Sequence, residues 1–213
     1  MAIVFLLTLV LGFGNSVPAR TANGPLPPFV VLHGLLFASW FVIYLAQAAL
    51  IATGRVTLHR ALGLAATVVA AGITVDGPIL AVTAVRRGDL GPDGLAFMLV
   101  MIVDVLAFAT FVAAALVYRH RAEAHKRLML LGTMSMLPPA ISRWPVVASH
   151  LASLVPIVLL GFLAAAPLRD RLSRRSIHPV SLWGGLALFL SVPVRFAIAH
   201  TTAWHRIAVW LVR

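Results

Sequence analysis

The side chains best placed to do chemistry in this sequence are ionisable groups inside long apolar runs. They are His33, Asp76, Asp104, His150 and Arg195, with Arg143 and His200 at the edges of such runs. A charge or an imidazole is costly to bury among apolar groups, so residues of this kind usually form ion pairs or functional sites. We therefore expect them to face inward and to meet in one polar cluster.

Two of these residues, His33 and His150, could ligate a cofactor. Neutral imidazole is a common axial ligand of haem and a common metal ligand, and facing helices can hold a cofactor between them. The alternative is a pair of histidines hydrogen-bonded within a helical bundle. The sequence has no cysteine and no His-Glu-x-x-His motif, which excludes covalent haem and leaves a zinc-peptidase site unsupported.

A stripe of side chains accompanies His33 at helical spacing. Phe37, Trp40, Tyr44 and Gln47 follow it at i+4, i+7, i+11 and i+14. The mixture of aromatic and polar groups suits the wall of a cofactor or substrate site, with Trp40 and Tyr44 beside the cofactor. The alternative is a face through which two helices pack, joined by its polar side chains.

The two aspartates predict a different chemistry. Asp76 and Asp104 could carry protons or act as counter-ions in a transporter, or they could form ion pairs with Arg143 or Arg195. Counting residues along each apolar run puts Asp76 and Arg195 at similar depth and Asp104 deeper. We therefore expect Asp76 to contact Arg195, with Asp104 at the floor of the site.

A second set of candidates consists of basic residues at the starts of apolar runs. They are Arg55, His59, Arg60, Arg121, His125, Lys126 and Arg127. Positive side chains at helix N-termini favour anions, which predicts contact with anionic lipid headgroups or an anionic ligand. The alternative is that they only anchor the topology. No lysine other than Lys126 occurs, so a retinal Schiff base in the last apolar run is excluded.

The composition predicts the kind of element that positions these residues. Hydrophobic residues make up 61% of the chain and charged residues 11%, whereas soluble domains carry about 25% charged residues. This balance predicts an all-α integral membrane protein, with the lipid bilayer as its main partner. The net charge of +11 lies in short segments between apolar runs, which is typical of membrane topology and not of nucleic-acid binding.

The apolar segments predict a bundle of about seven transmembrane helices in a single domain, residues 1–213. The segments are residues 1–14, 28–53, 61–85, 94–118, 126–142, 146–168 and 179–199. The first is short for a span, which would fit a start that lies further upstream. Pro138 is expected to push Leu137 out of the helical region, so the fifth and sixth segments could form one irregular unit.

The distribution of arginine and lysine predicts the orientation. The segments 54–60, 119–127 and 169–178 hold ten of these residues, whereas 15–27, 86–93 and 143–145 hold four. The richer set should be cytoplasmic. This places the chain in the cell membrane with its N-terminus in the cytoplasm and its C-terminus outside.

Two stretches carry a family resemblance. From His33 to Gly63 the chain reads His-Gly-x5-Trp-x6-Gln-x6-Gly-Arg-x3-His-Arg-x2-Gly, and residues 124–131 read Ala-His-Lys-Arg-Leu-Met-Leu-Leu. Together these stretches resemble a family of uncharacterised bacterial multipass membrane proteins. The resemblance extends through Arg143-Trp144-Pro145 and His178-Pro179. It implies a multipass fold in the bacterial inner membrane, and it implies no reaction.

Three functions stay open on these observations. The first is a redox or assembly protein that binds haem or a metal through His33 and His150. The second is a small-molecule or proton-coupled transporter that uses Asp76 and Asp104. The third is a non-catalytic membrane scaffold. Nothing in the sequence decides whether the chain is an enzyme.

Overall fold

The computed structural model describes residues 1–14, 16–21, 24–150 and 154–213, and all regular elements in these ranges are helices. This confirms the all-α prediction. Within the described residues, four stretches are long and apolar enough to cross a membrane: α3 (Pro28–Ala52), α4 (Val56–Arg86), α5 (Gly94–Val117) and Val180–Ala199. The last stretch comprises a π-helix, η1 (Val180–Gly184), followed by α10 (Gly185–Ala199). Uninterrupted apolar composition over this length is what a spanning helix requires.

The chain folds into two compact units that share helix α4. Unit 1 contains Met1–Asp76 and Leu137–Val155, and unit 2 contains Gly77–Met136 and Pro156–Arg213. Asp76 is therefore the last residue that α4 contributes to unit 1.

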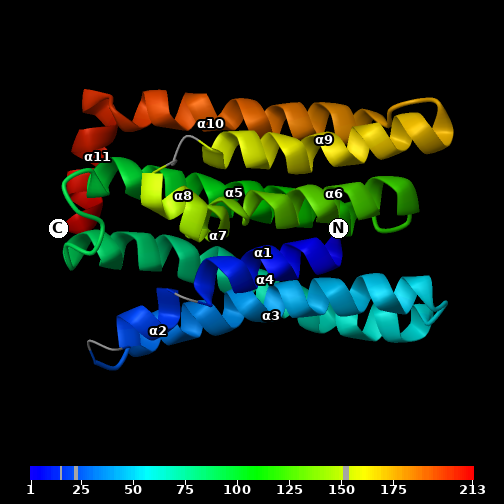
Figure 1. Ribbon diagram of the computed structural model, residues 1–213, viewed down its shortest axis with the longest axis horizontal. Helices are drawn as coiled ribbons and strands as arrows, with labels where there is room; N and C mark the ends of the chain where they lie inside the picture. The colour runs from blue at the N-terminus through cyan, green and yellow to red at the C-terminus, as the bar shows by residue number, and fades with distance from the viewer. Residues whose placement is uncertain (15, 22–23, 151–153) are drawn as a thin grey trace. The chain divides into compact units, whose positions relative to one another are not determined.

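In unit 1, helix α1 (Ala2–Phe13) packs on α3 and on the short helix α7 (Pro138–Ile141) (Figure 1). A Cβ atom on Gly12 would lie 2.3 Å from the carbonyl oxygen of Ala140, so this contact requires glycine. The indole Nε1 of Trp144 donates to the carbonyl of Thr8 at 3.2 Å. Two further short helices, α2 (Ser16–Thr21) and α8 (Pro145–His150), complete the unit.

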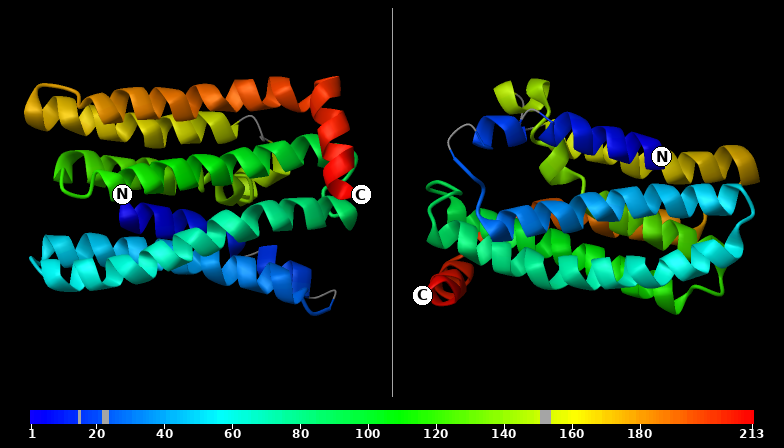
Figure 2. Two further views of the ribbon diagram at one scale, coloured as in Figure 1. Left: turned by 180° about the vertical axis from the view of Figure 1, so that it is seen from behind. Right: turned by 90° about the horizontal axis from the view of Figure 1, so that it is seen from below.

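In unit 2, α5 lies along α6 (Ala122–Ser135), and α10 packs on α5 (Figure 2). Gly132 lets the two helices approach closely, because a Cβ there would lie 3.2 Å from a methyl group of Val112. Helix α9 (Leu154–Arg174) leads to η1, which contacts α6. The helix after α10, α11 (Thr202–Val212), packs on α5 and α10.

The helix bounds differ from the expected ones mainly at the basic segments. Helix α4 already begins at Val56, α6 begins at Ala122 and α9 continues to Arg174, so much of the three expected cytoplasmic loops is helical. The physical reason is that Arg, Leu, Ala, Lys and Glu, which make up more than half of these segments, are strong helix formers. The charged ends of the helices therefore extend beyond their apolar parts.

The expected fifth segment, residues 126–142, is two helices rather than one. Helix α6 ends at Ser135 and α7 begins at Pro138. The break falls where expected, but the reason given for it was wrong, because Leu137 keeps right-handed helical dihedrals (φ −80°, ψ −32°). The interruption follows instead from Pro138 and Pro139, which lack the N–H groups that would continue the α6 hydrogen bonds.

Candidate functional site

The ionisable pair of unit 1 consists of His33 on α3 and Asp76 on α4. The Nδ1 atom of His33 lies 2.6 Å from the carboxylate Oδ2 of Asp76. Their side chains are 25% and 14% exposed, so the pair is neither sealed in the core nor open to its surroundings. The sequence analysis selected both residues as candidates, and in the structure their side chains are in contact.

The stripe that follows His33 is a packing face of α3. The ring of Phe37 lies 6.3 Å from Phe13 of α1, and the ring of Tyr44 lies 6.0 Å from Phe5. Trp40 is only 3% exposed. Helix α1 thus packs on this stripe of α3 at Phe37 and Tyr44, and Trp40 is buried within the protein.

Arg143 and His150 also belong to unit 1. The guanidinium of Arg143 lies 4.8 Å from the ring centroid of Phe13 and donates to the carbonyl of Pro139. A cation over an aromatic face is attracted by the ring quadrupole, so Phe13 offsets part of the burial of this charge. His150 ends helix α8, and its side chain lies outside the described residues.

The ionisable pair of unit 2 consists of Asp104 on α5 and Arg195 on α10. Both side chains are buried, and Nη1 of Arg195 donates to Oδ1 of Asp104. The carboxylate that pairs with Arg195 is therefore Asp104, whereas Asp76, which was expected to contact Arg195, pairs with His33. Four residues of the predicted cluster thus form two pairs, one within each unit.

The remaining residue of the predicted cluster is His200, which follows the last turn of α10. It is exposed, and it lines a shallow pocket beside Asp93 and His205.

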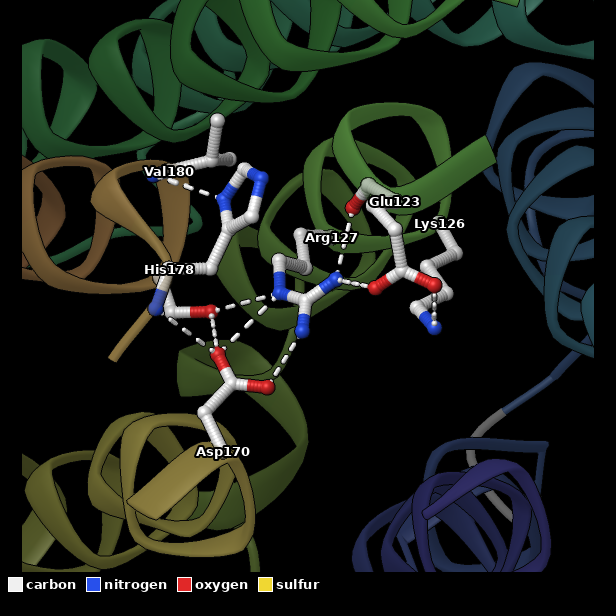
Figure 3. A network of polar contacts seen from close by, with 7 residues as sticks. Glu123, Lys126, Arg127, Asp170, His178 and Val180 are labelled. Carbon is white, nitrogen blue, oxygen red and sulfur yellow. Dashed lines mark hydrogen bonds and ion pairs between the residues drawn. The ribbon is translucent and has the colours of Figure 1, made fainter. Parts of the chain in front are cut away.

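Unit 2 also holds a polar network that the sequence did not predict as a unit (Figure 3). Arg127 on α6 is 5% exposed and donates to both carboxylate oxygens of Asp170 on α9. It also donates to the Glu123 carboxylate and to the hydroxyl of Ser181, which lies in η1. One buried guanidinium thus joins α6, α9 and η1.

Asp170 is the acceptor at the centre of this network. Ser181 donates to its Oδ2 at 2.8 Å, and the backbone N–H of His178 donates at 3.3 Å. The hydrogen bond from Arg127 is the main cause that lowers the pKa of Asp170 to about 2, against a smaller opposing effect of burial. Asp170 is therefore a carboxylate at neutral pH.

The network corrects the prediction for Arg127 and refines it for its neighbours. Arg127 is engaged within the fold and is not available to an anionic ligand. His125 bonds the carbonyl of Ala115 at 2.8 Å, and Lys126 pairs with Glu123 at the exposed edge. The other members of the basic set lie at the surface or half-buried: Arg55, Arg60 and Arg121 are exposed and His59 is intermediate.

Acidic residues across the chain are used almost entirely in ion pairs. Within the described ranges, five of the six pair with a basic side chain: Asp76, Asp89, Asp104, Glu123 and Asp170.

Comparisons with family models, curated proteins and solved structures found no match to this chain. The resemblance to a family of bacterial membrane proteins thus stays a prediction. Among the side chains that the structure describes, no group of three or more His, Asp or Glu residues is arranged to hold a metal ion. The two ion pairs and the Arg127 network are the polar groups from which a function has to be argued.

Proposed function

We propose that this chain is a multipass membrane protein that binds a haem-type cofactor at His33, with Asp76 as the residue that orients the imidazole. The observation that carries the proposal is the 2.6 Å contact between Nδ1 of His33 and the Asp76 carboxylate. Histidines that ligate metals commonly donate their second ring nitrogen to a carboxylate, which fixes the tautomer and makes the ligating nitrogen more basic. The contact to Asp76 leaves Nε2 of His33 as the ligating atom.

Haem fits the available ligands better than a bare metal ion. A bare ion needs several protein ligands, and the described side chains do not supply a group of three. Haem carries its own equatorial nitrogens and requires only axial ligands from the protein. His150 is the second residue that would hold the cofactor in this proposal. His33 would hold the cofactor through its partly exposed imidazole, because α1 packs on the stripe of α3 that follows it.

The proposal predicts a visible spectrum that depends on His33. Protein purified after haem-replete expression should show a Soret band, and His33→Ala should lose it because the axial ligand is gone. Asp76→Asn should retain the band with roughly 10–100-fold weaker haem affinity, since the orienting carboxylate becomes a neutral amide. His200→Ala is the matched control, because it removes an exposed imidazole and should leave the spectrum unchanged.

A wild-type protein without a Soret band would refute the haem proposal, as would a band that survives His33→Ala unaltered. The pair of His33 and Asp76 would then support proton-coupled transport, which is the second candidate function. The observation that favours it is the partial exposure of the pair, which lets a proton reach His33 or Asp76. Proton flux into proteoliposomes that is lost in Asp76→Asn would support it. If neither a Soret band nor proton flux is observed, the non-catalytic membrane scaffold is the function that remains.

The topology belongs to the same proposal. We propose about seven spans from the lengths of the apolar runs. The ten-to-four bias of basic residues then puts the segments 54–60, 119–127 and 169–178 in the cytoplasm. In this orientation Arg55, Arg60 and Arg121 contact anionic lipid headgroups on the cytoplasmic side. The N-terminus is then cytoplasmic, and α11 lies on the outer side.

The proposed orientation predicts the labelling pattern of a single introduced cysteine. Ala122→Cys, at the start of α6, should react with a membrane-impermeant maleimide only after the membrane is opened. Asp93→Cys, at an exposed position just before α5, should react in intact cells. Because the chain contains no cysteine, each label reports one position. Labelling of position 122 in intact cells would reverse the orientation.

A further inference from the structure

Helix α11 runs across the ends of α5 and α10 instead of extending them (Figure 1). Hydrogen bonds hold it at both ends. At its start, Thr201 accepts from the backbone N–H of Trp204, and the Trp204 indole donates to the carbonyl of Leu95 at 2.7 Å. At its end, the guanidinium of Arg86 donates to the carbonyls of Leu211 and Val212. These contacts fix which side of α11 faces outward.

The inward side of α11 is part of the core of unit 2. Trp204 and Ala208 are buried in a cluster with Met98 of α5 and Ala199 of α10. With 11 residues, α11 is far shorter than the length of about 20 that a spanning helix needs. It therefore lies across the ends of helices that are themselves long enough to span.

The outward side of α11 combines apolar and basic groups. Ile207 and Trp210 are 51% and 72% exposed and lie on one flank at i, i+3 spacing. The helix surface next to them forms a shallow hollow lined by His205, Arg206, Val209, Trp210 and Arg213. Residues 200–213 contain no acidic side chain. An exposed tryptophan beside two arginines is the composition of a helix that lies at a membrane surface.

We propose that α11 is an interfacial helix that docks unit 2 on the phospholipid surface. Ile207 and the Trp210 ring enter the boundary between headgroups and acyl chains, and Arg206 and Arg213 bind the phosphodiester of anionic lipids. The position of α11 supports lipid as the occupant, because α5 and Val180–Ala199, whose ends it crosses, are long and apolar enough to span. The proposal goes beyond the His33 site and does not depend on it.

The lipid contact can be tested with nitroxide labels at single cysteines in the full chain, reconstituted in nanodiscs of phosphatidylcholine and phosphatidylglycerol. A label at Ile207→Cys should collide mainly with oxygen, which partitions into lipid. A label at His205→Cys, on the other flank, should collide mainly with a water-soluble nickel complex. Equal exposure of both labels to nickel would overturn the proposal. Exclusion of both reagents from position 207, or spin–spin broadening there, would overturn it in favour of a second copy of the chain.

The charge contact has its own measurement. Arg206→Gln should lower the affinity for phosphatidylglycerol about fivefold, the effect of removing one cation near an anionic surface. The matched control is Arg87→Gln, because Arg87 already pairs with Asp89. Both substitutions lie at exposed positions, and a melting temperature equal to that of the parent protein shows that the fold is retained. An affinity unchanged in Arg206→Gln, or lowered equally in the control, would overturn the assignment.

Discussion

Replacing Asp170 by asparagine is expected to lower the free energy of unfolding by about 3–5 kcal/mol, because the buried Arg127 guanidinium loses its principal partner. Asparagine keeps one oxygen acceptor, but its NH2 group replaces the other carboxylate oxygen and faces donors that Asp170 now accepts from, Arg127, Ser181 and the N–H of His178. The measurement is unfolding in detergent, followed by tryptophan fluorescence. The matched control is Asp89→Asn, whose pair with Arg87 is exposed and should contribute less than about 1 kcal/mol.

The acid dependence of this effect follows from the pKa of Asp170. The folded protein holds this pKa at about 2, whereas an unfolded aspartate titrates near 3.9, about the ordinary value. A pKa that is lower in the folded than in the unfolded protein stabilises the fold. This stabilisation is fully present at pH values above the pKa of the unfolded state, and it is lost as the pH falls through the pKa of the folded state. The difference in stability between the parent protein and Asp170→Asn should therefore shrink between about pH 4 and pH 2. A difference that is constant over this range would contradict the ion pair.

The second large effect is expected at the Asp104–Arg195 pair. Arg195→Met alone should destabilise by about 3–5 kcal/mol, because it leaves a carboxylate buried among apolar side chains with no cation beside it. Asp104→Leu alone should have a comparable effect, since it leaves the buried guanidinium unpaired. The double variant should recover most of the loss, because an apolar pair of similar volume needs no compensation in this environment.

A double-mutant cycle turns this expectation into one number. The coupling energy between Asp104 and Arg195 should exceed about 1 kcal/mol, whereas independent sites add to within about 0.5 kcal/mol. The control is a second cycle that combines Arg195→Met with Asp93→Asn instead of Asp104→Leu. Asp93 lies at the start of the same helix, where it is exposed and makes no side-chain capping bond. Additivity in both cycles would show that the two buried charges do not depend on one another.

Much of the fold and part of the site could be predicted because the responsible signals are local. A long apolar run requires a helix whatever surrounds it, and α3, α4 and α5 each follow from such a run. The cost of burying an ionisable group also acts on each residue separately, so His33, Asp76, Asp104 and Arg195 could be selected from the sequence. Their pairing depends on helix rotation, which residue counting along the chain does not provide.

The Arg127 network was missed because its members look ordinary in their own segments. Asp170 lies among arginines, where an acid resembles one of many surface charges. Its burial results from the approach of α9 to α6 and η1, and no local pattern encodes this approach. Ser181 is positioned by a π-helical turn, which hydrophobic periodicity does not reveal. One signal in the sequence was available. The chain has six acidic residues and 17 arginines and lysines, so each carboxylate has several basic residues with which it could form an ion pair.

The two ends of the stretch formed by η1 and α10 are anchored to different neighbours, and this restricts how unit 2 can move. Ser181 ties one end to Arg127 and Asp170, while Arg195 ties the other end to Asp104. A sliding motion of one helical turn, about 5.4 Å, would break both anchors at once. Rearrangement of this stretch by a ratchet along its own axis is therefore strongly disfavoured. If the protein changes conformation, η1 and α10 should therefore move together with α5 and α6 as one rigid body.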